Sequence, residues 1–449
     1  MILSVKHPLF TADYRAQPYW WEAFAPPESG QDTLPVRASV VVVGGGYAGV
    51  CCALTLAQAG VDVLVLEAGR LGQGASTRSG GQVTGGVNVQ KKALAKGVQQ
   101  SPDSAARMTA RLRDTAQAMT YVETLIAQHA IDCGWHKTGR ITGLWLPQHY
   151  EQWAARLPTL NTETNAQARM MDAAEVKTEV GTDAYHGAAL IGRAGHLHPA
   201  KLYGGMLAAA RAAGARLMGD TPVTSITRHP AHYTVQTDRG SVHADQIVIA
   251  TNGYTSSITP ELKRGIVPIT SQIIATEPLS PDLVRSILPT NRAVSETRRV
   301  VNYYRLSPDG TRLLFGGRAR FVATGEETTA RLLYNAMTFR FPQLKGTRLT
   351  HSWSGNVAMT LDQTPHIGSA QGLHYALGCN GSGVAMMSYL GHSVARKIIR
   401  GGDTPINAFD MGELPSHPLY FGRPWFLFAI GSWYQFRDAF DHWRAQRRT

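Results

Sequence analysis

The sequence predicts a two-domain α/β protein, and three observations support this fold class. The chain has 449 residues, whereas one domain usually has about 100–200. Hydrophobic residues make up 43% of the chain and charged residues only 17%, which allows sizeable cores and excludes a largely disordered chain. A valine-rich strand at 39–43 is followed by a glycine turn, a helix at 50–59 and a second apolar strand at 61–66. This order is a βαβ unit, whose parallel strands are buried on both faces.

Further elements follow along the chain. Ser101-Pro102-Asp103 begins a long helix expected to reach about residue 130, because serine caps free amides and proline fits a first turn. Other helices are expected at 199–213 and 383–399, and strands at 141–146, 221–227, 233–237, 246–250 and 372–377. Residues 1–35, which hold Trp20 and Trp21, predict an irregular arm packed on the body.

The formal charge of +12 raises the question of an acidic partner. Basic residues are scattered rather than grouped in blocks, so a solvated basic surface is favoured and no nucleic-acid partner is expected. No segment resembles a signal peptide, and no run reaches the ~18–20 apolar residues of a membrane helix.

The four cysteines, Cys51, Cys52, Cys133 and Cys379, form neither a disulfide framework nor a metal-ligand set, which favours a reducing, cytoplasmic location. His196 and His198 have a spacing that metal ligands also use. Because Pro199 follows directly, these histidines are better explained as a helix entry, and no metal is expected.

A glycine loop follows the first strand. Gly44, Gly46 and Gly49, with Tyr47 and Ala48 between them, match the pattern GxGxxG. The first glycine permits a tight turn, the second lets a pyrophosphate approach the backbone, and the third lets helix and strand pack closely. Glu67 stands 18 residues beyond Gly49, at a strand end where a carboxylate can bind ribose hydroxyls and disfavours NADP. The loop alone does not separate NAD from FAD.

The segment from Gly72 to Val83 distinguishes FAD from NAD and favours FAD. Its small residues let the backbone lie against a large flat ring, and Ser76 and Arg78 can bind pyrophosphate. A flexible surface loop is the alternative explanation of this composition.

Residues 74–81, GASTRSGG, resemble the flavin segment of the D-amino-acid-oxidase-type flavoproteins, with Ser79 where asparagine is usual. Residues 247–254 are similar to that family's strand ending in ATNGY, and residues 378–384 to its late glycine loop before a helix. Within the family the chain is most similar to the γ-glutamylputrescine oxidoreductases, on residues 302–307, 313–318 and 357–360. Cys379, Asn380 and Ser382 depart from the usual late loop, and Leu314 stands near the place of a lysine that helps sarcosine oxidases react with oxygen.

The resemblance implies a Rossmann-like FAD-binding domain in three pieces, 36–90, 196–260 and 350–405. It also implies an α+β substrate domain, 91–195 and 261–349, built on a largely antiparallel sheet; 1–35 and 406–449 are the arm and the tail. One noncovalent FAD is expected, because residues 357–359 lack the cysteine that attaches flavin in sarcosine oxidases; attachment through Cys379 is the less favoured alternative. The expected cofactor-binding residues are Gly44, Gly46, Tyr47, Ala48, Gly49, Glu67, Ala75, Ser76, Arg78, Gly80, Gly81, Gln82, Val223, Ala250, Thr251, Asn252, Gly381, Ser382, Gly383 and Val384.

The resemblance further implies oxidation of an amine C–N bond, with hydride passing from the α-carbon to flavin N5 and water hydrolysing the imine. The expected substrate is a γ-glutamyl-polyamine or an amino-acid-like amine. Tyr303 and Arg305 are predicted to orient it, Arg305 and Arg318 to bind a carboxylate, and Trp353 to wall the pocket. An ion pair with a nearby acid explains either arginine equally well. A membrane-surface dehydrogenase that reduces a quinone and a flavoprotein that acts on tRNA are the alternatives.

The tail combines eight aromatic residues between Tyr420 and Phe436 with five arginines, Arg423, Arg437, Arg444, Arg447 and Arg448. Docking of the tail on the body or on a second subunit is favoured over weak contact with a membrane surface, because aromatic residues dominate well-packed interfaces. The oligomeric state does not follow from the sequence.

Overall fold

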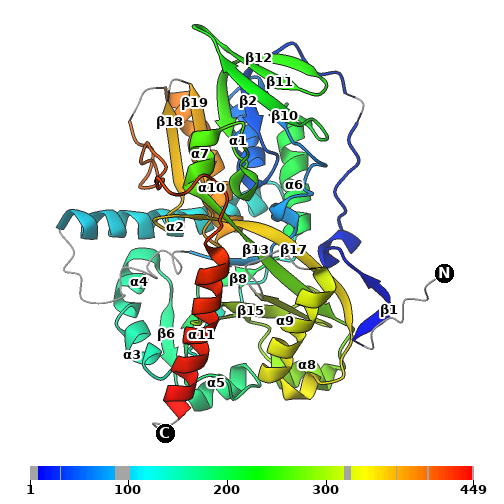
Figure 1. Cartoon of the computed structure of the whole chain (residues 1–449), viewed down its shortest axis with the longest axis vertical. Helices are drawn as coiled ribbons and strands as arrows, with labels where there is room; N and C mark the ends of the chain where they lie inside the picture. The colour runs from blue at the N-terminus through cyan, green and yellow to red at the C-terminus, as the bar shows by residue number, and fades with distance from the viewer. Residues whose placement is uncertain are drawn as a thin grey trace.

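The computed structural model describes residues 9–30, 32–85, 102–317, 325–370, 372–401 and 404–446. Two large sheets form its framework. Figure 1 shows the sheet that contains β2 and β12 in the upper half and the sheet that contains β13 and β17 in the lower half.

The upper sheet has eight strands, and its centre is parallel. The path runs through β10 (Val223–Arg228), β11 (Tyr233–Thr237), β12 (Gly240–Ile249), β2 (Arg37–Val43), β3 (Val63–Leu66) and β9 (Arg216–Met218). β19 (Leu373–Leu377) pairs with β12, and β18 (His366–Ala370) pairs with β19. Val40 to Val43 are buried because helices cover both faces of the sheet, as a parallel sheet requires.

Helices α1 (Tyr47–Gln58), α6 (Pro199–Ala212), α10 (Gly383–Arg400) and the long α2 (Pro102–Gln128) belong to this layer. All four agree with the helices expected from the sequence to within a few residues. α2 contributes Ala118, Met119 and Val122 to the core of the upper sheet. The expected division at residue 91 assigns α2 to the same domain as the lower sheet, although α2 packs with the upper sheet.

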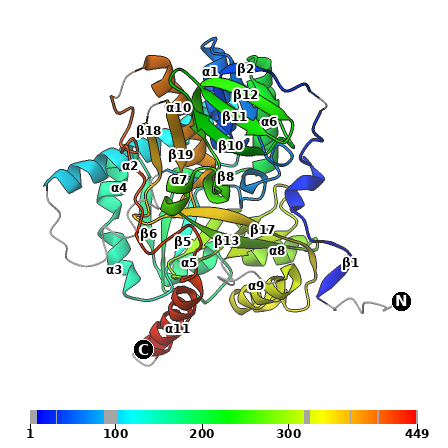
Figure 2. The ribbon, with the colours of Figure 1, turned by 45° about the horizontal axis from the view of Figure 1, so that its top comes forward.

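The lower sheet has nine strands and is largely antiparallel, as expected. Its order is β1 (Phe10–Arg15), β17 (Leu349–Thr360), β13 (Ile266–Thr276), β16 (Leu313–Gly317), β15 (Asn302–Leu306), β14 (Ala293–Glu296), β5 (Arg140–Gly143), β7 (Ala188–Ile191) and β6 (Ala168–Met171). Only β1 with β17 and β14 with β5 are parallel neighbours. Helices α3 (His149–Ala154), α4 (Leu157–Thr164), α5 (Ala173–Glu179), α8 (Pro281–Ile287) and α9 (Glu326–Arg340) pack around this half (Figure 2).

Smaller elements join the halves: β4 (Gln82–Thr84) pairs with β8 (Ala194–His196), and α7 (Pro260–Gly265) precedes β13. The tail ends in α11 (Leu427–Gln446). Within the described ranges, no helix combines the length and apolar composition needed to cross a membrane.

Two features differ from the sequence-based expectation. The arm is not wholly irregular, because β1 adds a parallel edge strand to the lower sheet and a short 3-10 helix holds the fully buried Trp20. The expected domain limit at residue 350 falls inside β17, which pairs with β13 along its length and so belongs to the lower sheet up to Thr360. The sequence of an apolar strand does not indicate which sheet the strand will join.

A buried ion pair fixes α9 to the lower sheet. The Arg340 guanidinium donates to both carboxylate oxygens of Glu296 and to Asn302 Oδ1, 3.1 Å away. Tyr185 Oη donates to Glu296 at 2.8 Å and also contacts Tyr304 Oη at 2.7 Å. Burial opposes the charge of Arg340, but Glu296 outweighs it and raises the pKa of the guanidinium. Glu296 therefore links the Arg340 guanidinium of α9 and the Tyr185 hydroxyl in one buried hydrogen-bonded cluster.

Glu296→Gln is expected to lower the free energy of unfolding by about 3–5 kcal/mol, because Arg340 stays buried without its counter-ion. Glu277→Gln is the matched control, since Glu277 pairs with the half-exposed Arg348 and the change should cost about 1 kcal/mol or less. Urea unfolding followed by circular dichroism measures both. Equal losses in the two variants would contradict the role given to the buried pair.

Candidate active site

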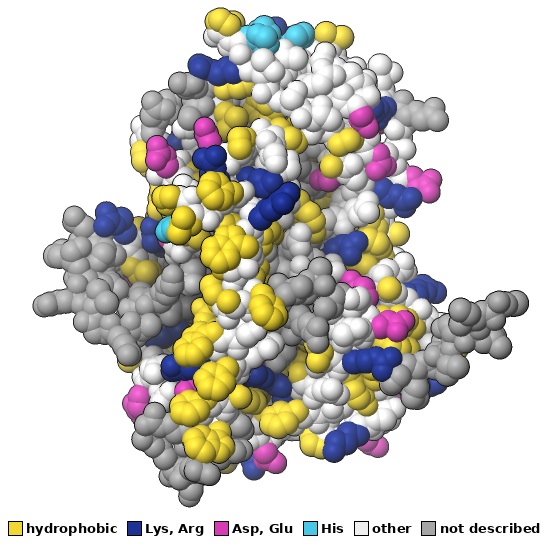
Figure 3. All heavy atoms as spheres, in the orientation of Figure 1, with side chains coloured by type: hydrophobic (Ala, Val, Ile, Leu, Met, Phe, Trp, Pro, Cys, Tyr) yellow, Lys and Arg dark blue, Asp and Glu magenta, His cyan; other side chains and the backbone are white. Residues whose placement is uncertain are grey.

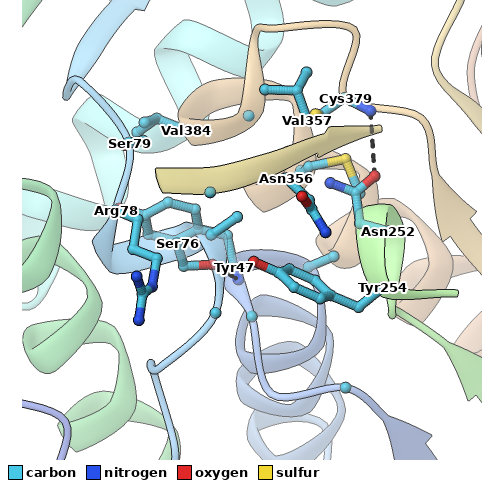
Figure 4. A pocket seen from close by; sticks show the side chains of 18 of the residues that line it. Tyr47, Ser76, Arg78, Ser79, Asn252, Tyr254, Asn356, Val357, Cys379 and Val384 are labelled. Carbon is cyan, nitrogen blue, oxygen red and sulfur yellow. Dashed lines mark hydrogen bonds between the residues drawn. The ribbon is translucent and has the colours of Figure 1, made fainter. Parts of the chain in front are cut away.

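A cavity of about 890 Å³ lies between the two sheets. The upper sheet contributes the glycine loop and the residues after β3 and β12, and the lower sheet contributes residues of β5, β14, β15 and β17. In an α/β sheet, ligands bind at the carboxyl ends of the parallel strands, which is where this cavity opens. Figure 4 shows part of its lining, with Tyr47, Ser76 and Arg78 beside Asn252 and Tyr254.

The glycine loop has the close contacts that its pattern predicts. Gly44 has φ +106°, and a Cβ there would lie 2.8 Å from the Ala250 carbonyl oxygen. A Cβ on Gly49 would lie 1.9 Å from the Gly44 carbonyl oxygen, so only glycine lets α1 pack this closely beneath the turn. Gly46 is the N-cap of α1, and the Tyr47 N–H donates to Ser76 Oγ at 3.0 Å. The first turn of α1 therefore presents its amides and the positive end of its dipole to the cavity.

Glu67 lies in the cavity wall directly after β3, as predicted. Its carboxylate accepts from the Gly45 N–H at 2.7 Å and the Gly69 N–H at 3.2 Å. Burial is the main influence on this group and raises the pKa of its carboxyl, although the backbone amides act against it. These amides fix the carboxylate beside the loop, where it can accept from ribose hydroxyls.

The flavin-like segment forms a second wall. Ser76, Arg78, Gly80 and Gly81 line the cavity, and Gly81 has φ +68° with no room for a Cβ against the Leu197 carbonyl oxygen, 2.2 Å away. The Arg78 guanidinium donates to the carbonyl oxygens of Gln73 at 2.8 Å and Ser354 at 3.1 Å. It also lies 4.7 Å from the Trp21 ring. Its contact with a pyrophosphate stays a prediction.

Two loops close the cavity near α10. Asn252 adopts φ 46°, and its Oδ1 accepts from the Gly378 N–H at 3.0 Å and the Cys379 N–H at 3.3 Å (Figure 4). Asn380 anchors the same loop to β17, because its Oδ1 accepts from the Thr360 N–H at 3.1 Å. Asn380, which departs from the family's usual late loop, therefore has a structural role as the anchor of this loop. Gly381, Ser382, Gly383 and Val384 line the cavity at the start of α10.

The other residues expected to bind the cofactor, with one exception, also line the cavity. Ala48, Ala75, Gln82, Val223, Ala250 and Thr251 line the cavity. Gly49 does not, because it serves the packing of α1 on β2.

The lower sheet contributes Arg140, Ser271 and Ser295, which the sequence did not single out, and the predicted residue Tyr303. Arg140 on β5 donates to Ser295 Oγ on β14 and, at 3.5 Å, to Thr84 Oγ1. Burial lowers the pKa of the Arg140 guanidinium to about 10, and no carboxylate among the described residues pairs with it. Tyr303 lines the cavity nearby, with its Oη 3.0 Å from Ser271 Oγ. The sequence signal for Arg140 was a cationic residue at the first position of a short buried strand.

The residues predicted to contact the substrate do not all lie in the cavity. Tyr303 lines the cavity, whereas Arg305 and Trp353 are buried outside the lining. Arg305 lies 5.1 Å from the Trp20 ring, and burial lowers the pKa of its guanidinium to about 9. Trp353 supports the flavin-like segment, because its indole N–H donates to the Arg78 carbonyl oxygen at 2.8 Å. Arg318 lies outside the described residues.

His198 and His196 have ordinary structural partners. The Lys201 N–H donates to His198 Nδ1 at 3.1 Å, which caps α6 as the helix-entry explanation requires. His196 Nε2 lies 2.9 Å from the Asn291 carbonyl oxygen.

These features fit an elongated dinucleotide with a flat ring. Two helix N-termini, those of α1 and α10, meet one cavity, and the absence of a side chain at Gly46 leaves open space beside the α1 amides. Glu67 lies where its carboxylate can bind a ribose. Residues from Arg78 to Gln82 line the part of the cavity between Glu67 and Arg140. The residues present therefore fit FAD.

Comparisons with known proteins agree with this fit. The family model described as DAO, FAD dependent oxidoreductase, matches residues 39–397. Gamma-glutamylputrescine oxidoreductase of Escherichia coli (strain K12) is 34% identical over 87% of this chain and 90% of that protein. The probable oxidoreductase OrdL of Rhizobium meliloti (strain 1021) is 32% identical over 94% of this chain and 97% of its own length.

Solved structures share the fold. L-proline dehydrogenase from P. horikoshii superposes with a TM-score of 0.69 at 21% identity, covering 84% of this chain and 97% of that one. Glycine oxidase from Geobacillus kaustophilus also has a TM-score of 0.69, at 22% identity, covering 85% of this chain and all of that one. With the family model matched over most of its length, the chain belongs to the DAO family of FAD-dependent oxidoreductases.

Proposed function

We propose that this enzyme oxidises the C–N bond of an amine that also carries a carboxylate, such as a γ-glutamyl-polyamine or an amino-acid-like amine. The chain is an FAD-dependent oxidoreductase related to enzymes of amines and amino acids. The observation that supports the anionic end is Arg140, a buried cavity-lining cation whose described partners are hydroxyl groups. A buried guanidinium that has only hydroxyl partners binds a carboxylate most favourably, because its planar fork matches the two carboxylate oxygens.

Several residues of the chain can orient such a substrate. Arg140 and Ser295 would hold the carboxylate, while Tyr303 and Ser271 offer hydroxyl groups beside them. Gln82 lies between the two halves, with its amide nitrogen 3.3 Å from the Val294 carbonyl oxygen. Burial of these groups excludes water and strengthens their electrostatic interactions with a bound ligand.

The substrate amine must be neutral to lose a hydride from its α-carbon. Bound FAD would supply the acceptor for the two electrons that leave with this hydride. The substrate carboxylate would balance the charge of Arg140, and the amine proton would pass to solvent water before the hydride leaves. The N-terminus of α10 favours negative charge at its end of the cavity. Water then hydrolyses the imine to a carbonyl compound and an amine.

Acid precipitation of the purified enzyme should leave the yellow flavin in the supernatant. Cys379 lines the cavity, but its Sγ points to the Ala358 carbonyl oxygen, 3.7 Å away, and residues 357–359 contain no cysteine. Absorbance of the two fractions measures the outcome. Colour retained in the pellet would show a covalent link and contradict the proposal of noncovalent FAD.

Gly46→Val should abolish FAD binding, because the new side chain would begin 3.1 Å from Ser76 Oγ and fill the space beside the α1 amides. Gly325→Val is the control: Gly325 also precedes a helix, and no atom lies within 4 Å of its Cβ position. The ratio of flavin absorbance to protein absorbance measures binding, and thermal unfolding confirms folding. A fully yellow Gly46→Val protein would show that the loop is misassigned.

Arg140→Met should raise KM for a carboxylate-bearing amine about ten- to a hundredfold, since a lost charge-assisted bond costs about 1.5–3 kcal/mol. Arg140→Lys should restore part of the loss. Arg156→Met is the control, because Arg156 is as buried (6% against 8%) but lies on Trp153 outside the cavity.

The assay is anaerobic flavin bleaching with γ-glutamylputrescine, sarcosine, pipecolate, D-amino acids and putrescine. Putrescine has no carboxylate, so its KM should be insensitive to Arg140. If KM for every carboxylate-bearing substrate is unchanged in Arg140→Met, the anion site is wrong while amine oxidation stands. If no amine bleaches the flavin of the parent enzyme, the proposed function itself is wrong.

A further inference from the structure

The C-terminal helix exposes a continuous aromatic surface. We define the tail face as Trp425, Phe428, Trp433, Phe436, Phe440 and Trp443, all of which are exposed. Figure 3 shows apolar side chains running down α11 as one stripe on the front of the molecule. A contiguous apolar surface of this kind marks a contact site, whereas single exposed hydrophobic residues do not.

The tail face is ordered by its own contacts. Ring centroids of Trp433 and Phe436 lie 5.9 Å apart, those of Phe436 and Phe440 6.1 Å, and those of Phe440 and Trp443 5.8 Å. Positions 433, 436, 440 and 443 follow the three- and four-residue spacing that puts side chains on one side of a helix. The aromatic groups thus form one ladder that faces away from the body.

The opposite side of α11 is attached to the body by its acids. Asp438 accepts from the backbone N–H groups of Arg299 at 3.3 Å and Val300 at 3.1 Å, and its side chain is only 3% exposed. The Arg299 guanidinium pairs with Asp438 at 3.0 Å and with Asp441 at 2.8 Å. The tail does dock on the body just before and at the start of α11, because Tyr420 and Leu427 are buried against β13 and the Tyr420 hydroxyl donates to the Ile266 carbonyl oxygen at 2.6 Å. Along the rest of α11, however, the acidic side faces inward and the aromatic residues are exposed. Docking on a second subunit stays a prediction.

This arrangement leaves basic charge around the tail face. Asp438 pairs with Arg298 and Arg299, and Asp441 pairs with Arg299 and, at 3.9 Å, with Arg437, which is partly exposed beside Trp433. Arg423 is exposed. Gly422 lies against the Lys263 side chain, next to the exposed Arg264, which adds basic residues near the start of the face. The whole chain has a formal charge of +12.

We propose that the tail face binds the surface of an anionic phospholipid membrane, with α11 lying in the interface plane. Charge complementarity favours this partner over a second copy, because two copies joined through this face would bring like-charged arginines together. Tryptophan and phenylalanine rings between arginines are the composition of interfacial helices, which gain from apolar insertion and from attraction to anionic lipid. The ion pairs of Asp438 and Asp441 hold the helix along the protein surface with its rings outward.

Vesicle sedimentation with the intact holoenzyme tests the proposal. The enzyme should pellet with vesicles of phosphatidylglycerol and phosphatidylcholine, bind vesicles of phosphatidylcholine alone far less, and lose binding as salt rises. Phe436→Ser should lower the partition coefficient about tenfold, because one buried phenyl group is lost from the interface. Phe339→Ser on α9 is the matched control, since Phe339 is 58% exposed and Phe436 59%.

Charge is tested in the same way. Arg423→Glu should weaken binding, whereas Arg228→Glu on β10 of the upper sheet should not, although both change the net charge equally. Flavin content and thermal unfolding of each variant should equal those of the parent.

Three results would overturn the proposal. One is a parent enzyme that ignores anionic vesicles at low salt, and another is equal losses in Phe436→Ser and Phe339→Ser. The third is light scattering without vesicles that shows a dimer in the parent and a monomer in Phe436→Ser, which would assign the face to a second copy. None of these results bears on amine oxidation.

Discussion

The contact between Gly49 and the carbonyl oxygen of Gly44 is the constraint on which the nucleotide-binding half depends. A Cβ at Gly49 would stand 1.9 Å from that oxygen, so the absence of a side chain lets α1 begin directly beneath the end of β2. Gly44 itself needs φ +106° and lies against Ala250 at the end of β12. Two parallel strands and one helix therefore converge on one turn, and the turn aims the α1 amides into the cavity.

The flavin-like segment is held from outside by tryptophans that are far away in sequence. Trp20 donates its indole N–H to the Ser79 carbonyl oxygen at 2.9 Å, and Trp353 donates to that of Arg78 at 2.8 Å. Trp21 donates to Thr77 Oγ1 at 2.9 Å. Three consecutive residues of the segment are thus fixed by the N-terminal arm and by β17. This bracing gives the arm a structural reason to pack here, and it explains why Trp353 is buried behind the cavity wall.

Three buried arginines show how partners decide the role of a charge. Arg340 has a full complement of partners around Glu296 and stabilises the lower sheet. Arg305 rests on the Trp20 ring outside the cavity, and burial lowers the pKa of its guanidinium to about 9. Arg140 faces the cavity with hydroxyl partners. A buried cation is costly without a counter-charge. Of these three arginines Arg140 alone lines the cavity, and we propose that a substrate carboxylate supplies its counter-charge.

The sequence by itself determined the βαβ unit, the glycine loop and Glu67, because these depend on contacts between residues close in the chain and on spacings that only a strand, turn and helix satisfy. It also indicated the family and the parts of the cavity lining that belong to the glycine loop, the flavin-like segment and the start of α10. The tertiary structure alone decided that β1 joins the lower sheet, that α2 packs with the upper one and that α11 turns its acids inward. It also decided which arginine faces the cavity: Arg140 and Ser295 are 155 residues apart and meet only because β5 pairs with β14. Strand pairing of this kind depends on packing across the whole chain, which local pattern does not encode.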